Sequence, residues 1–145
     1  MATTIKRDSR GVAIAAIIVA AWLGLLVYLL RFPVDFASPL PYLFMLLQTH
    51  LYTGLFITAH DAMHGVVAPG RPTLNRLIGT ITAFLFAYNW YPRLLPKHHL
   101  HHKHVATEED PDYHHGSFWL WYYSFLKNYI TWWQILLMAI TYNVL

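Results

Sequence analysis

Lys97-His98-His99-Leu100-His101-His102-Lys103-His104 is the stretch around which this sequence is organised. Half of the ten histidines of the chain lie within it. If the stretch is helical, His98, His101 and His102 share one face, because they stand at i, i+3 and i+4, while His99 points elsewhere. Three imidazoles on one face predict a metal site, because neutral imidazole is a common nitrogen ligand for iron and zinc.

A second pair of histidines lies upstream, in His60-Asp61-Ala62-Met63-His64. On a helix His60 and His64 are one turn apart, so two helices facing each other are predicted to hold one or two metal ions. Two simpler interpretations stay open: a solvated, pH-sensitive histidine-rich face, and adventitious binding of zinc or nickel. His50 stands alone within an apolar run, and we interpret it as a packed, hydrogen-bonded residue.

Three carboxylates accompany the histidine motifs. Asp61 adjoins His60, and Asp110 and Asp112 follow the second motif. A carboxylate that accepts the second N–H of an imidazole orients that ring toward a metal, and we predict this supporting role for all three. The alternative for each is a helix cap or a solvated loop charge.

The composition is that of a membrane protein. Hydrophobic residues make up 57% of the 145 residues and charged residues only 12%, whereas about a quarter of the residues of a soluble protein are charged. The chain has no cysteine, which excludes disulfides and thiolate metal sites. The net charge of +3 is spread out, so no nucleic-acid partner is expected. We predict one all-α integral membrane domain over residues 1–145.

Long apolar runs predict two to three membrane spans. Their approximate bounds are residues 12–30, 40–59 and 129–145. Lys6, Arg7 and Arg10 precede the first run, and the positive-inside rule then places the N-terminus in the cytoplasm. A signal peptide is the alternative for this run, but its apolar core would be shorter, roughly 7–15 residues. The last run reaches Leu145 without a polar tail, so we expect a chain truncated at its C-terminus.

Residues 74–91 pose a topological problem, because a spanning helix there would put the two histidine motifs on opposite sides of the membrane. Their apolar residues follow a stripe at helical spacing. The stripe consists of Leu74, Leu77, Ile78, Ile81, Phe84, Leu85 and Tyr88. We therefore predict an interfacial or re-entrant helix over about 74–91, which keeps both motifs on the cytoplasmic side. Pro96 is then expected to open the helix that bears His98.

Taken together, the motifs resemble those of the membrane fatty-acid desaturase and hydroxylase superfamily, in which His-Asp-x-x-His is followed by His-x-x-His-His. The similarity is closer to bacterial β-carotene ketolases (β-carotene 4,4′-oxygenases). It is carried by the segment from Gly54 to Gly65, by Ala68-Pro69-Gly70-Arg71-Pro72, by the histidines of Lys97–His104, and by Asp110-Pro111-Asp112-Tyr113.

This resemblance implies a desaturase-like fold in the bacterial inner membrane. It also implies a di-iron oxygenase that uses O₂ and the electrons of a ferredoxin-type donor protein. The substrate would be a carotenoid whose β-ionone rings are oxidised at C4, as in the conversion of β-carotene to echinenone and canthaxanthin. Zinc is an alternative metal in purified protein. A fatty-acyl desaturase or hydroxylase of the same superfamily, or a non-catalytic histidine-rich membrane protein, is the alternative function.

The resemblance also assigns the metal ligands, which are His60, His64, His98, His101 and His102. The superfamily carries a third motif, His-x-x-His-His, farther downstream, and the present sequence has no counterpart of it. Five histidines fall short of the usual coordination of two irons, so we expect the chain as given to have little or no activity alone.

Overall fold

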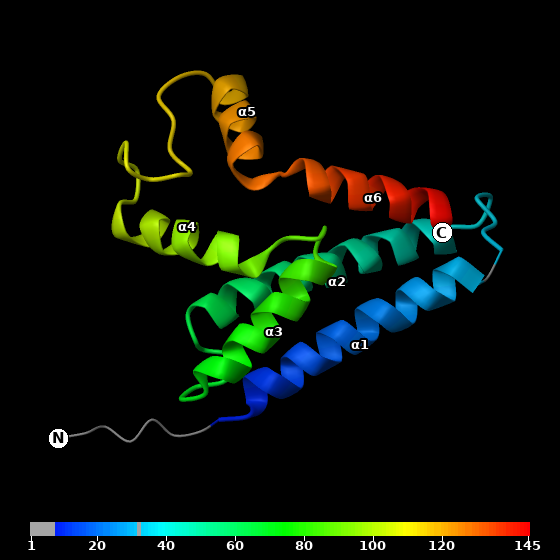
Figure 1. The fold of residues 1–145 in the computed structure, drawn as a ribbon. Helices are drawn as coiled ribbons and strands as arrows, with labels where there is room; N and C mark the ends of the chain where they lie inside the picture. Colours follow the sequence, from blue (N-terminus) through cyan, green and yellow to red (C-terminus); the bar gives the residue numbers. More distant parts are fainter. Residues whose placement is uncertain (1–7, 32) are drawn as a thin grey trace. The chain divides into compact units, whose positions relative to one another are not determined.

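The computed structural model describes residues 8–31 and 33–145, and within them all regular structure is α-helical (Figure 1). The helices are α1 (Arg10–Arg31), α2 (Leu40–Met63), α3 (Pro72–Leu85), α4 (Tyr91–Lys103), α5 (Phe118–Tyr129) and α6 (Trp132–Val144). The predicted all-α class is therefore confirmed. Lys6 and Arg7, which entered the prediction of topology, lie outside the described residues. The helices form two compact units, a first unit up to Phe86 and a second unit from Ala87.

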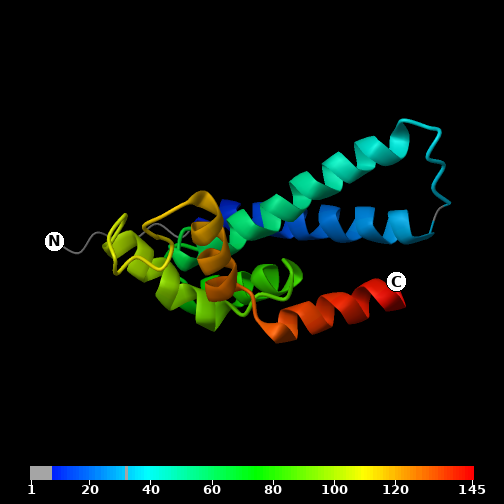
Figure 2. The same cartoon turned by 90° about the horizontal axis from the view of Figure 1, so that it is seen from above.

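In the first unit, α1 and α2 form an antiparallel hairpin (Figure 2). They contain 22 and 24 residues, which corresponds to about 33 and 36 Å of helix at 1.5 Å per residue. The hydrocarbon core of a bilayer is about 30 Å thick. Both helices are long and apolar enough to cross a membrane, and only a small share of their apolar windows is buried within the protein.

Small and aromatic side chains join α1 to α2. A Cβ atom on Gly54 would lie 3.1 Å from Cγ2 of Ile18, so glycine at this position allows the two backbones to approach. Trp22 is buried, and its ring centroid lies 6.0 Å from that of Tyr52. Close approach through small residues is typical of helices that associate inside a membrane.

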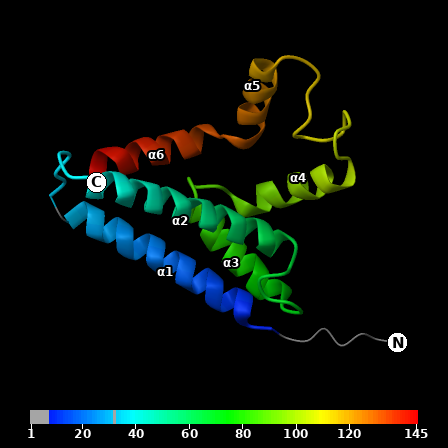
Figure 3. The same ribbon diagram turned by 180° about the vertical axis from the view of Figure 1, so that it is seen from behind.

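The helix α3 packs on α2 (Figure 3), and its buried residues are small or polar. The buried residues of α3 are Asn75, Gly79, Thr82 and Ala83. The predicted apolar stripe is present but points outward, since Leu77, Ile81 and Phe84 are all exposed. A helix with this arrangement can expose its apolar face to lipid. The interfacial or re-entrant placement of the helix stays a prediction.

The predicted helix over residues 74–91 ends early, at Leu85. The reason is a reversal of the backbone at Ala87 and Tyr88, whose φ angles of 53° and 55° lie in the left-handed region. Such a conformation costs about 1–3 kcal/mol for a residue with a Cβ atom. Gln134 stabilises the reversal, because its Nε2 donates hydrogen bonds to the Ala87 carbonyl at 3.2 Å and to Oδ1 of Asn89 at 3.0 Å.

The expectation that Pro96 opens the second histidine helix is wrong. Pro92 stands in the first turn of α4, and Pro96 lies inside the helix. The helix begins one residue ahead of Pro92, at Tyr91, which is buried. Proline is well tolerated at that position because the first N–H groups of a helix have no partner within it.

The third apolar run is divided. The helix α5 ends at Tyr129, and α6 begins at Trp132 after a capping box. In this box, Thr131 Oγ1 accepts a hydrogen bond from the Gln134 N–H at 3.3 Å, and Gln134 Oε1 accepts one from the Thr131 N–H at 2.9 Å. The 13 residues of α6 extend about 20 Å, which is less than a bilayer core. The third span therefore stays a prediction.

Asn75 closes the loop that follows the first histidine pair. Its side chain is buried, with the residue 4% exposed. Oδ1 accepts a hydrogen bond from the Ala68 N–H at 2.9 Å, and Nδ2 donates to the carbonyls of Ala68 at 2.7 Å and Gly65 at 3.2 Å. Nδ2 also donates to the Arg71 carbonyl at 3.3 Å, so one amide bonds four backbone groups, and buried backbone groups require such partners.

We expect Asn75→Ala to lower the free energy of unfolding by about 1–3 kcal/mol, because the buried Ala68 N–H would lose its partner. Chemical unfolding of the purified protein in detergent measures this change. Asn143→Ala is the matched control, since Asn143 is exposed and its amide donates to a carbonyl of its own helix, that of Ala139. Equal stability of the two variants would contradict the assigned role.

Candidate metal centre

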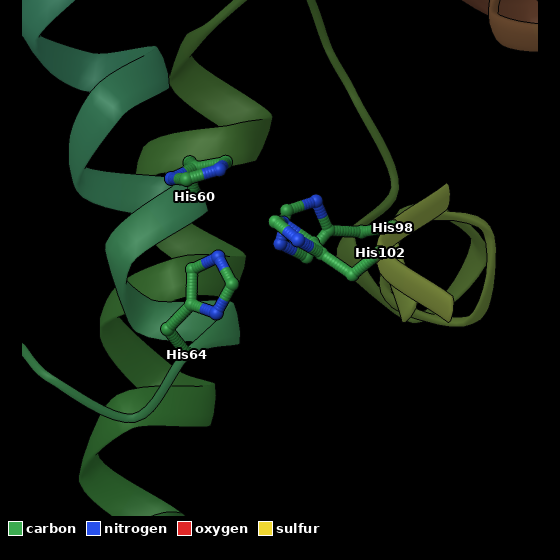
Figure 4. Close-up of side chains that lie close together, drawn as sticks. All are labelled: His60, His64, His98 and His102. Atoms are coloured by element: carbon green, nitrogen blue, oxygen red, sulfur yellow. The ribbon is translucent and has the colours of Figure 1, made fainter. Parts of the chain in front are cut away.

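The first histidine pair stands at the C-terminal end of α2. His60 lies in the last turn and His64 is the C-cap residue. Both rings point to the same side of the helix (Figure 4), and their centroids lie 4.8 Å apart. Nδ1 of His60 lies 3.3 Å from Oδ1 of Asp61, which is the contact that an orienting carboxylate requires. Such a contact directs Nε2 of His60 away from Asp61.

The second pair consists of His98 and His102 on α4. Their ring centroids are 4.5 Å apart and the rings meet edge to face. The two side chains leave α4 on the same side (Figure 4), as the i, i+4 spacing predicts. His99 and His102 are both exposed, so exposure does not distinguish His99 from a predicted ligand, and its exclusion stays a prediction.

His101, which the sequence predicts on the same face, contacts this pair through His102, because their ring centroids lie 5.5 Å apart. His101 also faces two carboxylates. Its Nδ1 lies 2.9 Å from Oδ1 of Asp110 and 3.4 Å from Oδ2 of Asp112. The hydrogen bond to Asp110 raises the pKa of His101 above its ordinary value. With Nδ1 engaged by carboxylate, Nε2 is the nitrogen of His101 that is suited to bind a metal.

The carboxylate of Asp110 is the buried centre of this arrangement, with the side chain 3% exposed. Its Oδ1 accepts the Asp112 N–H at 2.9 Å and its Oδ2 accepts the Ala106 N–H at 3.0 Å. Burial by itself raises the pKa of Asp110, but the hydrogen bonds from Asp112, His101 and Ala106 outweigh it and leave the pKa below its usual range. Asp110 is therefore an anion that faces His101.

His101, Asp110 and Asp112 bring their donor atoms within 4.8 Å of one another, and such a group can in principle hold a metal itself. Both oxygens of Asp110, however, already accept backbone N–H groups. This arrangement suits a carboxylate that orients the imidazole of His101 better than one that binds a cation directly.

Two residues of α5 donate hydrogen bonds to the loop that contains Asp110 and Asp112. Neither residue was identified from the sequence. Nε1 of Trp121 donates a hydrogen bond to the Asp112 carbonyl at 2.8 Å. Nδ2 of Asn128 donates to the Pro111 carbonyl at 3.1 Å. These contacts join residues that are nine and 17 positions apart, so periodicity in the sequence contains no signal for them.

The fatty acid desaturase family profile matches residues 37–144. The chain therefore belongs to the fatty acid desaturase family. Among curated proteins, it is 41% identical over 128 residues to a beta-carotene ketolase of Paracoccus sp. (strain N81106 / MBIC 01143), with 88% of this chain and 53% of the relative covered.

Two further relatives have related names. The chain is 48% identical over 92 residues to a beta-carotene ketolase of Paracoccus sp. (strain PC1), covering 63% of this chain and 38% of the relative. It is 36% identical over 158 aligned positions to a zeaxanthin 4-ketolase of Chlamydomonas reinhardtii, covering 97% of this chain and 34% of the relative. The chain thus spans about half or less of the length of these relatives, and the resemblance to ketolases is confirmed. The search of solved structures gave no match.

We expect Asp110→Asn to loosen the loop around His101, because an amide nitrogen would face a backbone N–H and leave one donor without an acceptor. Hydrogen exchange should become about tenfold faster at the amides of Ala106 and Asp112. Mass spectrometry of the exchanged protein measures this change.

Glu108→Gln is the matched control for this experiment. Its side chain lies in the same loop, is 85% exposed, and has a described contact only with His115. If the amides of Ala106 and Asp112 exchange as slowly in Asp110→Asn as in the control, Asp110 does not hold the loop.

Proposed function

We propose that this protein is a carotenoid ketolase that uses histidine-bound iron and O₂ to oxidise C4 of β-ionone rings. The observation that supports it best is the pair of histidines one helical turn apart on α2 and again on α4, in a chain 41% identical to a beta-carotene ketolase. Membership of the fatty acid desaturase family is consistent with an oxidoreductase that acts on a lipid.

The donor set fits a metal of the iron or zinc type, because all the proposed ligands are imidazole nitrogens. In this proposal His60, His64, His98, His101 and His102 contribute five of the ligands of a di-iron centre. Asp110 and Asp112 fix His101 from its Nδ1 side, and Asp61 does the same for His60. Iron, when bound, supplies the activation of O₂ that no protein side chain can supply.

The proposed reaction consists of two hydroxylations at one carbon. In each, one oxygen atom enters a C–H bond at C4 and the other leaves as water, with two electrons and two protons consumed. A ferredoxin-type protein is the proposed electron donor. The carbon then carries two hydroxyl groups, and loss of water leaves the ketone. The protein's part is to hold the ligands in fixed orientations and to position the ring beside them.

The proposed setting is the bacterial inner membrane, with the N-terminus and both histidine motifs on the cytoplasmic side. The length and apolar character of α1 and α2 support insertion into a bilayer. The outward apolar stripe of α3 supports contact with lipid. A carotenoid dissolves in the hydrocarbon core, so a membrane protein meets this substrate where the substrate accumulates.

The main alternative is a fatty-acyl desaturase or hydroxylase, which the description of the matching family favours. The names of the more similar relatives favour the ketolase. A non-catalytic, histidine-rich membrane protein is the remaining alternative.

The protein, expressed from its natural gene in cells that accumulate β-carotene, should convert this pigment to echinenone and canthaxanthin, which chromatography separates. His98→Ala should abolish conversion and lower the iron content of the purified protein, because a proposed ligand is lost. His99→Ala is the matched control on the same helix, and both properties should persist in it.

Three results would contradict the proposal in different ways. An altered fatty-acid profile with unchanged carotenoids would favour the desaturase. Equal iron contents in His98→Ala and His99→Ala would remove the support for the metal ligands. If cells that contain the folded protein convert neither the carotenoid nor a fatty-acid substrate, the non-catalytic alternative is favoured.

A further inference from the structure

Tyr129, the last residue of α5, is linked to His101 through a carboxylate. Its hydroxyl donates a hydrogen bond of 2.5 Å to Oδ1 of Asp112. The other carboxylate oxygen, Oδ2 of Asp112, lies 3.4 Å from Nδ1 of His101. The three side chains therefore form a continuous row within the second unit, although Tyr129 belongs to α5 and His101 to α4.

The ring of Tyr129 is itself held from two sides. The ammonium group of Lys97 lies 4.8 Å from the ring centroid, a favourable cation–π distance. The ring of Phe125, one turn earlier on α5, has its centroid 4.7 Å away. Lys97 also donates a hydrogen bond to the Asn128 carbonyl. Because Lys97 lies one turn before His101 on α4, Tyr129 keeps its place relative to the helix that bears His101.

Asp112 needs such a partner more than Asp110 does. The oxygens of Asp110 are fixed by two backbone N–H groups, whereas the Asp112 side chain is 28% exposed. Both carboxylates approach the same imidazole nitrogen, so their negative charges repel each other. Donation of the Tyr129 hydroxyl stabilises the charge on Asp112 and restricts its rotation.

We propose that Tyr129 is a positioning residue for the metal ligand His101 and acts through Asp112. The inference rests on the proposed function only in taking His101 as a ligand. In this role the hydroxyl of Tyr129 holds Asp112, and the two carboxylates together fix the imidazole plane so that Nε2 keeps its direction. Tyr129 makes no contact with substrate in this role.

The test is the rate at which an iron(II) chelator removes iron from the purified protein, made from its natural gene. Tyr129→Phe keeps the ring, and with it the contacts to Lys97 and Phe125, but removes the hydroxyl. Iron loss should become about threefold to tenfold faster, below the ~10–100-fold effect typical of a group that touches a ligand directly. Tyr123→Phe is the matched control on the same helix, because Tyr123 is 65% exposed.

A double-mutant cycle with Asp112→Asn tests the route. If Tyr129 acts through Asp112, adding Tyr129→Phe to Asp112→Asn should not accelerate iron loss further. If the two substitutions multiply each other's effect on the rate of iron loss, Tyr129 does not act through Asp112. If Tyr129→Phe and Tyr123→Phe lose iron at the same rate, Tyr129 has no positioning role. If Tyr129→Phe does not fold, Asp112→Asn tests the same link, and unchanged iron retention there would overturn the proposal.

Assay of carotenoids in the same proteins separates this inference from the proposed function. If Tyr129→Phe loses iron faster than the wild-type protein and the wild-type protein leaves β-carotene unchanged, the positioning role is supported and the ketolase is contradicted. Conversion of β-carotene with equal iron retention in the two tyrosine variants would contradict the positioning role alone. A wild-type protein that retains no iron would overturn both.

Discussion

The ionised carboxylate of Asp110 is the group on which the local structure of the second unit depends. Burial of an unpaired charge costs several kcal/mol, so a side chain that is 3% exposed must be compensated on all sides. Asp110 obtains this compensation from the N–H groups of Ala106 and Asp112 and from the ring of His101. One requirement thus fixes the path of the loop and the orientation of the imidazole together. The orientation of His101 therefore has an electrostatic origin.

The first unit solves the same problem with a neutral group. Asn75 combines an acceptor with two donors in one planar amide, and it bonds both the N–H and the C=O of Ala68. In each unit, one buried polar side chain closes the loop that follows a histidine motif. The difference has a chemical reason. An amide can satisfy donors and acceptors of the backbone at once, whereas a carboxylate only accepts and so demands N–H groups and a ring nitrogen as partners.

Local periodicity was sufficient to predict part of this structure. The apolar runs contained α1 and α2, and the i, i+4 spacing placed His60 beside His64 and His98 beside His102. The end of α3 was not predictable in this way, because Gln134, far along the chain, holds the backbone reversal after it. The sequence predicted that Asp110 and Asp112 orient an imidazole, but not that this imidazole is His101. Spacings of three and four residues are equivalent on a helix, and only the position of Asp110 distinguishes them.

The helix α3 inverts the usual relation between exposure and mutational tolerance. Its inner face carries small or polar residues, since Asn75, Gly79, Thr82 and Ala83 are buried, and a larger side chain at a buried position forces its neighbours to move. Its outer face is apolar without being part of a protein core, so side chains of different shape are expected to be acceptable at Leu77, Ile81 and Phe84 as long as they stay apolar. Variants of this helix should therefore be classified by the size of the residue on one side and by its polarity on the other. A single hydrophobicity scale applied to the whole helix would rank them wrongly.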